Sequence, residues 1–543
     1  MKEHHFKVDL HRILTFAVLA AAVVAVMAVR FQAAPVPLER DEGEYALMGQ
    51  LILDGMPPYH DAANMKLPGT YYAYSVILAV FGQTATGIHL GLMAVSLIST
   101  VILYLIAIPL LGFSGAALAG AAFVVMSADT AVLGLFAHAT HFVVMFALAG
   151  TWLLLQRSVS KHGIPFLFGA GICFGLAFIM KQSGIFFGLF GLSWVIFGAL
   201  RSRPVAWKGL IVDSCAVTSG IILPYVLVLA LMAHEGVLGG FWFWTVDYAG
   251  AYASQVNLAY GIRLFRSGIV PIIRNNPLIW SMAAAGMAGI WLTRAGRGIA
   301  PFLSGFFLFS FLAVCPGLFF REHYFVQILP AAALGAGAAL WAIGELAAGY
   351  TRWSRALQFS ILVAVVAFSL TGTYSTECFL AGSTPDQVSR SIYGENPFPE
   401  SVKIAEYLKE HTKPGDRIAV MGSEPQICFY AHRRSATEYI YMYGLMEPQP
   451  FALRMQEEAI AQVEKSDPRF FVFVPISTSW LQQSDSERKI FSWMHRYLEN
   501  YRPVMVADIF SDHTRWLMDQ EAESFTRSPG SSQVIVFKRK NAE

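Results

Sequence analysis

Two stretches near the N-terminal end decide the fold: ERDEGEY at residues 39–45 and NMKLPGTY at residues 64–71. From Tyr45 to Ile52 the apolar residues recur with helical spacing, which predicts a helix lying in the plane of a membrane interface. The acidic residues of the first stretch closely follow a long apolar run. Charge so near an apolar boundary indicates function, and a solvated loop face is the alternative.

The composition indicates that these two stretches lie beside membrane-spanning helices. Of the 543 residues, 55% are hydrophobic and only 14% are charged, whereas a soluble domain carries about 25% charged residues. Because a spanning helix needs about 20 apolar residues, we read twelve candidate stretches. They lie at residues 13–31, 68–82, 88–111, 115–134, 141–156, 164–180, 184–200, 209–233, 277–293, 300–316, 324–346 and 356–376.

Basic residues in the connecting loops predict the orientation of the spans. The clusters are Arg201–Lys208, Arg294–Arg297 and Arg352–Arg355. The positive-inside rule places them, together with the basic N-terminal end, in the cytoplasm. The loop at 32–67 and everything after residue 377 then face outward. Since an inside start and an outside end require an odd number of spans, we predict eleven or thirteen, with one stretch between 68 and 200 miscounted.

The chain becomes polar near residue 380, which predicts a membrane domain at 1–379 and a soluble, extracytoplasmic α/β domain at 380–543. Periodicity and turn residues define the elements of the second part. The predicted helices are 401–411, 450–465 and 487–501, and the predicted strands are 417–422, 470–475 and 533–538.

Charge and cysteine content exclude several functional classes. The net charge of +2 gives no case for nucleic acid as a partner. None of the five cysteines forms a CxxC pair, and three lie in or beside apolar runs, so neither a disulfide framework nor a zinc site is supported.

Lys66 precedes a span that begins with Pro68. A cation at a helix N-terminus adds to the free backbone N–H groups and the helix dipole, and together they suit a phosphate. The alternative is a lysine that anchors its charge at the interface.

The motif DEGEYA at residues 41–46, followed by Lys66-Leu67-Pro68, resembles the GT-C membrane glycosyltransferases. The families most similar in pattern are the dolichyl-phosphate-mannose–protein mannosyltransferases and the aminoarabinose transferases. The resemblance implies that Asp41 activates the acceptor, that Lys66 contacts the carrier phosphate, and that Glu42 orients one of these groups. Glu44 and Tyr45, inside the motif, are candidate substrate-binding residues.

Two further groups of polar residues are expected to face outward. His138 and His141 share a helix face and are candidates for substrate binding, with an interfacial or core pair as the alternative. Related transferases carry an aspartate where this chain has Thr140, so no family role is carried over there.

Arg321, His323 and Tyr324 precede the span at 324–346. The resembled families have a basic and aromatic element before a corresponding span that helps to hold the lipid phosphate, which implies this role for Arg321 and His323. An interfacial anchor is the alternative reading.

The resemblance implies a polyprenyl-phosphate-linked sugar as donor, and a protein, glycolipid or wall polymer as acceptor. The departing phosphate gains a negative charge, so cations such as Lys66 and Arg321 stabilise the transition state more than the ground state. Asp41 serves as the one base, and displacement at the anomeric carbon inverts configuration. We favour no metal, with Mg²⁺ or Mn²⁺ held by Asp41 and Glu42 as the alternative.

We expect a multi-pass protein of a prokaryotic inner or plasma membrane whose active site lies on the extracytoplasmic side. A transporter or flippase of a lipid-linked sugar is the competing function, and it predicts charges at the bilayer midplane and inverted repeats. A non-catalytic membrane protein would leave Asp41, Lys66 and Arg321 without a common purpose.

Overall fold

The computed structural model describes residues 10–157, 163–202, 204–348, 354–374, 382–525 and 532–540. Arg352 and the N-terminal lysines used above to predict orientation lie outside these ranges. The chain divides into two compact units. The first consists of Met1–Gln32, Gly91–Val228 and Val256–Leu380, and the second of Ala33–Leu90, Leu229–Gln255 and Ala381–Glu543. The second unit therefore contains more than the C-terminal part that we separated at residue 380.

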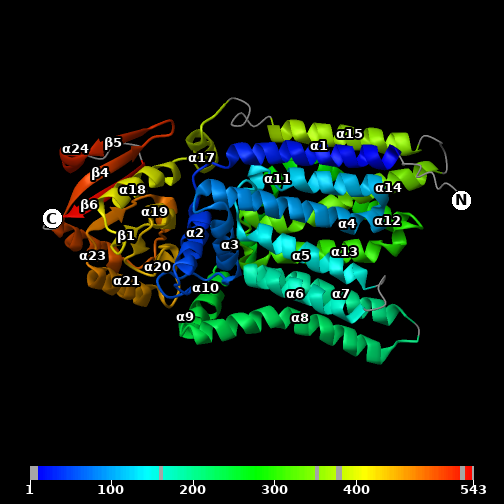
Figure 1. Cartoon of the computed structure of the whole chain (residues 1–543), viewed down its shortest axis with the longest axis horizontal. Helices are drawn as coiled ribbons and strands as arrows, with labels where there is room; N and C mark the ends of the chain where they lie inside the picture. The colour runs from blue at the N-terminus through cyan, green and yellow to red at the C-terminus, as the bar shows by residue number, and fades with distance from the viewer. Residues whose placement is uncertain are drawn as a thin grey trace, which may run out of the picture. The chain divides into compact units, whose positions relative to one another are not determined.

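The first unit is a bundle of apolar helices whose axes run side by side (Figure 1). The helix pairs with the most extensive packing are α12 with α14 and α5 with α6. The helices that build it are α1 (Leu10–Ala33), α4 (Ala85–Met126), α5 (Ala139–Gln156), α6 (Gly163–Met180), α7 (Ile185–Arg201), α8 (Trp207–His234), α12 (Pro277–Leu292), α13 (Ala300–Val314), α14 (Leu329–Ala348) and α15 (Ser354–Tyr374).

The described residues contain eight helices that are long and apolar enough to cross a membrane. One of them, α4, is broken at Gly112, whose φ is 64°, so its 42 residues form two helices. Counting both halves and adding the shorter apolar helices α12 and α13, which pack along α14 and α7, gives eleven apolar helices among the residues that the structure describes.

The remaining apolar stretch of the sequence forms α3 (Gly69–Phe81). Its 13 residues make a helix of about 20 Å, and like α12 and α13 it is an apolar helix shorter than those long enough for a span. The predicted number of spans, eleven or thirteen, therefore stays a prediction.

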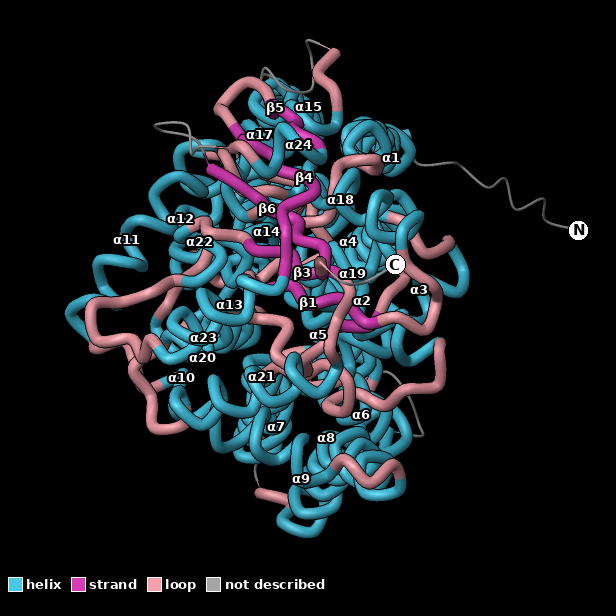
Figure 2. Tube along the Cα trace, turned by 90° about the vertical axis from the view of Figure 1, so that its left-hand side faces the viewer, coloured by secondary structure: helices cyan, strands magenta, loops and turns pink. Residues whose placement is uncertain are grey.

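The second unit contains a six-stranded mixed sheet with the order β2-β1-β3-β6-β4-β5 (Figure 2, magenta). β1 is parallel to β2 and β3, and the other pairs are antiparallel. The strands are β1 (Arg417–Met421), β2 (Arg434–Ser435), β3 (Phe470–Phe473), β4 (Tyr501–Ile509), β5 (Thr514–Met518) and β6 (Ser532–Arg539). The predicted α/β class and all three predicted strands are confirmed, as β1, β3 and β6, whereas β2, β4 and β5 were not predicted.

Helices surround this sheet and connect its strands. The main ones are α17 (Pro385–Tyr393), α18 (Phe398–His411), α19 (Pro425–Ala431), α20 (Tyr443–Met446), α21 (Ala452–Ser466), α22 (Ser477–Trp480), α23 (Lys489–Tyr497) and α24 (Asp519–Glu523). The predicted helices at 401–411 and 450–465 are confirmed. The one at 487–501 is shorter than predicted, because a 3₁₀ turn at Leu498–Asn500 leads into β4.

α2 (Arg40–Leu53) is the predicted helix of the first loop, but it is covered on more than one side. It packs against α3 and against α19, and most of its residues are buried. A Cβ atom on Gly43 would lie 2.8 Å from Gln426 of α19, and one on Gly49 would lie 3.0 Å from the backbone of Ser75 in α3. An interfacial helix buries one face only, whereas α2 is covered by both α3 and α19. The sequence did not predict this because α19 comes from a part of the chain nearly 400 residues away.

Candidate active site

The N-terminus of α2 is fixed by a capping box. The Glu39 carboxylate accepts a hydrogen bond from the backbone N–H of Glu42 at 2.8 Å, and the Glu42 carboxylate accepts one from the N–H of Glu39 at 3.4 Å. Glu42 also lies 3.0 Å from Nε2 of His89, whose Nδ1 lies 2.8 Å from the Ala34 carbonyl oxygen. The Glu42 side chain is fully buried. Glu42 thus fixes the turn that carries Asp41, which agrees with the orienting role that the resemblance implies, and its part in catalysis stays a prediction.

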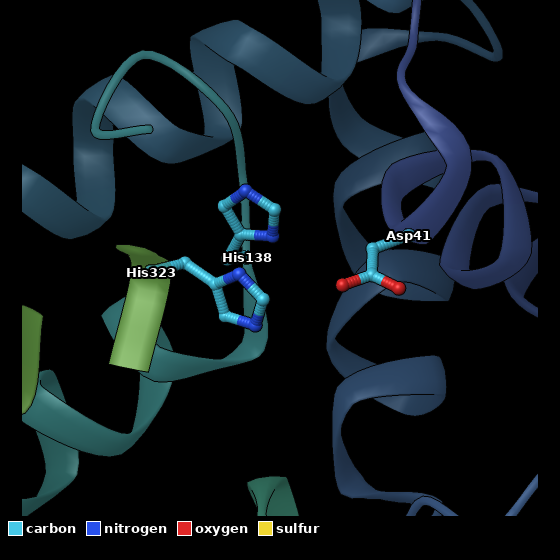
Figure 3. A group of neighbouring side chains, drawn as sticks. All are labelled: Asp41, His138 and His323. Carbon is cyan, nitrogen blue, oxygen red and sulfur yellow. The ribbon is translucent and has the colours of Figure 1, made fainter. Parts of the chain in front are cut away.

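Asp41 and Lys66 lie in direct contact. Lys66 Nζ is 2.9 Å from Asp41 Oδ1, and the Tyr441 hydroxyl donates to the same oxygen at 2.9 Å. The two side chains keep 22% and 19% of their surface exposed, so both are accessible to a small group from solvent. Figure 3 shows the Asp41 carboxylate projecting from the start of α2. The structure thus brings together the two residues on which the sequence interpretation depends.

Glu44 is the second carboxylate that holds Lys66, at 2.7 Å. Asn64 donates to the same Glu44 oxygen at 2.8 Å, and the Tyr71 hydroxyl donates to the other oxygen at 2.7 Å. The Glu44 side chain is fully buried. Both Glu44 oxygens accept hydrogen bonds from protein donors and hold Lys66 in place, and the prediction that Glu44 binds substrate stays a prediction.

Two carboxylates and one ammonium group determine the electrostatics of this cluster. Burial acts to lower the pKa of Lys66, but the charges of Asp41 and Glu44 outweigh it and hold that pKa well above 10.5. Burial raises the pKa of Glu44, and the charge of Lys66 opposes the shift. Lys66 Nζ also lies 4.5 Å from the centre of the Tyr45 ring, a cation–π contact. Lys66 is therefore charged throughout the neutral range.

Tyr45 was predicted as a substrate-binding residue, and the structure buries it. It is 2% exposed, and its ring packs against those of Tyr71 and Tyr74 at 6.2 and 5.2 Å between centroids. The Tyr45 ring also lies 4.5 Å from Lys66 Nζ, so it packs against the lysine as well as against the two tyrosines.

The first unit contains a separate basic and aromatic cluster. The rings of His138 and His323 stack at 4.2 Å with an angle of 11° between their planes (Figure 3). His323 meets Tyr324 edge to face at 4.9 Å, and Lys181 Nζ lies 3.5 Å from the centre of the Tyr324 ring. The sequence singled out His138, His323 and Tyr324 separately, and the fold places them in one cluster.

Short elements present these side chains. His138 is the N-cap of α5, and His323 and Tyr324 lie on the 3₁₀ segment η6 (Glu322–Ile328). Arg321 is the N-cap of η6, and its guanidinium lies 5.9 Å from the Phe319 ring. His141, in the first turn of α5, is 4% exposed.

Four residues of these clusters were missed in the sequence. Lys181 carried a weak signal, because it is a single cation between two apolar helices, α6 and α7. Tyr441, Asn64 and His89 carried none, since each acts through contacts with residues distant in the chain.

Comparison with known proteins gives a sequence match over part of the chain. A family model described as dolichyl-phosphate-mannose-protein mannosyltransferase matches residues 65–227. The matched range includes Lys66, His138 and Lys181 and begins after Asp41. No curated protein sequence matches the chain significantly.

Solved structures match over almost the whole chain. ArnT from Cupriavidus metallidurans in the apo state has a TM-score of 0.56 at 14% identity, covering 96% of this chain and 98% of that one. The same protein bound to undecaprenyl phosphate gives 0.54 at 16% identity, covering 85% and 93%. The oligosaccharyltransferase AglB from Archaeoglobus fulgidus, in complex with an inhibitory peptide and a dolichol-phosphate, gives 0.52 at 12% identity, covering 95% and 75%. The chain is therefore a polytopic membrane protein with the fold of the GT-C glycosyltransferases, and it resembles the mannosyltransferase family in sequence over residues 65–227.

Proposed function

We propose that this chain transfers a sugar from a polyprenyl-phosphate carrier to an acceptor on the extracytoplasmic face of a membrane, with inversion at the anomeric carbon. The observation that carries the proposal is the contact of Asp41 with Lys66 at 2.9 Å. It places a base beside a cation at a partly exposed position of the second unit. Both groups are those that the sequence motif assigned to the acceptor and to the carrier phosphate.

Lys66 binds the phosphate of the donor. Glu44 is fully buried and held by Asn64 and Tyr71, so it keeps the lysine in place, whereas Asp41 is partly exposed and easier to displace. A phosphate oxygen therefore takes the place of Asp41 beside Lys66. The leaving phosphate gains a second negative charge, and the lysine stabilises it more strongly in the transition state than in the ground state.

Asp41 takes the proton of the acceptor hydroxyl or amine. While Lys66 and Tyr441 both donate to its Oδ1 atom, the ionised carboxylate is stabilised and is a weak base. Loss of the lysine to the donor phosphate removes one of these donors. Binding of the donor thereby strengthens the base, which limits proton removal to the loaded enzyme.

The basic and aromatic cluster of the first unit contains further cations. The prediction that Arg321 and His323 contact the donor phosphate is retained, and Lys181 is added because its ammonium lies over the Tyr324 ring. A lysine and an arginine beside aromatic rings suit a phosphate joined to a prenyl chain, since the rings contact the apolar part.

We propose that no metal is needed for the transfer. Asp41 and Glu44 are ion-paired with Lys66, which supplies the positive charge that a divalent ion would otherwise bring to these carboxylates. Glu42, the partner of Asp41 in the metal alternative, is bonded to His89 and to the N-terminus of α2.

The test separates transfer from transport of a lipid-linked sugar. Purified full-length chain is reconstituted in vesicles that contain polyprenyl-phosphate-linked hexoses or pentoses with a labelled sugar, and membrane extracts supply the acceptor. A transferase converts the donor to polyprenyl monophosphate, which mass spectrometry of the extracted lipids detects. Movement of intact donor across the vesicle bilayer, without release of the monophosphate from any donor, would instead establish the transporter. Vesicles without protein provide the baseline.

A further inference from the structure

The amphipathic helix α11 (Leu258–Asn275) presents three different faces. Its buried face is made by Gly261, Gly268 and Ile272. This face packs on η5 (Pro316–Leu318), on η6 and on η1 (Thr130–Val132). The contact is close, because a Cβ atom on Gly261 would lie 2.9 Å from Leu318 and one on Gly268 would lie 2.8 Å from Phe325.

A second face of α11 is apolar and exposed. Leu258 is 68% exposed, Ile262 is 46% exposed and Ile273 is 40% exposed, and Ile269 is half-buried. At 100° per residue these four positions fall within about 60° of one another. They form a continuous stripe along the helix, which we call the apolar stripe of α11. An exposed apolar stripe of this kind is a contact surface for lipid chains or for another apolar partner.

The third face carries Arg263, Arg266 and Arg274, which fall together on the adjoining side of the apolar stripe. All three are exposed, and α11 contains no acidic residue. Within the ranges that the structure describes, no carboxylate forms an ion pair with any of the three. The guanidinium of Arg263 lies 5.3 Å from the Tyr260 ring. The face thus presents three positive charges without acidic partners.

We propose that α11 lies in the membrane interface and binds the headgroups of anionic phospholipids through Arg263, Arg266 and Arg274. The apolar stripe enters the acyl region while the arginines lie at the level of the phosphates. Lipid is the occupant that matches both faces at once, since its anionic headgroup pairs with arginines and its acyl chains contact apolar side chains.

A membrane-spanning placement of α11 fits less well. The helix passes the length and composition test for a span only when joined to Leu238–Ala253. A spanning α11 would place Arg266 near the middle of the bilayer, where an arginine costs about 2.5–3.5 kcal/mol on insertion scales. In the interface the three arginines are attracted by anionic lipid.

The test measures which lipids contact α11 in the full-length chain. All five native cysteines are replaced by alanine, and Ile262, an exposed residue of the apolar stripe, is replaced by cysteine and labelled with bimane. Vesicles contain either phosphatidylglycerol or phosphatidylcholine brominated in the acyl chains, diluted in unlabelled phosphatidylcholine. At low salt we expect brominated phosphatidylglycerol to quench the bimane fluorescence at a lower mole fraction than brominated phosphatidylcholine. Each arginine should lower the mole fraction needed by about fivefold. The preference falls as salt is raised.

The matched variants separate charge at α11 from net charge. Replacing the three arginines by glutamine removes the preference, and replacing them by lysine retains it. A control triple, Lys409→Gln, Lys465→Gln and Arg496→Gln, removes the same charge from the second unit and leaves the preference intact.

Equal quenching by the two lipids in the unmodified helix overturns the proposal, as does an unchanged preference in the glutamine triple or a lost preference in the control triple. Abolition of the preference by inorganic phosphate at constant ionic strength overturns the assignment to bilayer lipid. A single Arg266→Gln variant gives the same readout with a smaller change if the triple variant is not produced.

Discussion

Removal of the Lys66 charge tests whether the lysine stabilises the buried Glu44 carboxylate in the folded protein. In Lys66→Met, the fully buried Glu44 carboxylate keeps only the neutral donors Asn64 and Tyr71. Breaking one side of a buried ion pair costs about 3–5 kcal/mol, and the 19% exposure of the Lys66 side chain places the expected loss at the lower end, about 3 kcal/mol. Glu44→Gln in the same chain removes the stranded charge and should recover about 2 kcal/mol of that loss.

Hydrogen exchange of α2 measured by mass spectrometry reports this loss locally. A loss of about 3 kcal/mol corresponds to exchange of the α2 amides about a hundredfold faster than in the unmodified chain, and the double variant should return most of the way. Lys409→Met, an exposed lysine of α18, is the matched control and should leave α2 unchanged. Exchange in Lys66→Met within threefold of the parent, or no recovery in the double variant, would refute the ion-pair account.

Two further outcomes are expected from the same cluster. Because the pKa of Lys66 is held well above 10.5, its charge-dependent stabilisation is fully present below pH 10.5 and is lost only as pH rises through that raised value. At pH 9 the lysine should therefore react with acetic anhydride far more slowly than exposed Lys409, and Asp41→Asn should speed its reaction; equal rates before and after that substitution would contradict the pairing. Tyr441→Phe removes the hydrogen bond that still orients the Asp41 carboxylate when Lys66 contacts the phosphate. The lost orientation outweighs the more basic carboxylate and should lower the transfer rate about tenfold, whereas Tyr443→Phe, whose hydroxyl donates to Thr478, should not; equal effects of the two would exclude a specific role for Tyr441.

The membrane bundle and the α/β class were predictable, because both depend on local composition and periodicity. Apolar runs gave the spans, and alternating patterns gave the strands at 417–421 and 470–473. The apolar run at 68–82 forms a helix of only 13 residues, a length that composition does not show. β4 was missed because its first residue, Tyr501, closes a helical pattern.

The candidate site was predictable only where its residues lie close in sequence. Asp41 and Lys66 are 25 residues apart and flank one loop, so a motif could join them. Tyr441 is 400 residues from Asp41 and reaches it through the packing of the second unit. The burial of Glu42 and Glu44 was also invisible, because acidic residues in a loop are usually solvated, and here His89, Asn64 and Tyr71 replace the water.

The central claim is that the Asp41 carboxylate removes the acceptor proton during sugar transfer from a lipid phosphate. The most direct measurement is the single-turnover rate of transfer from labelled polyprenyl-phosphate sugar by Asp41→Asn, with Asp54→Asn at the exposed C-terminal end of α2 as the matched control. The account predicts a fall of about 10²–10⁴-fold for Asp41→Asn at unchanged donor binding, and no change for Asp54→Asn. A transfer rate for Asp41→Asn equal to that of the unmodified chain would contradict it.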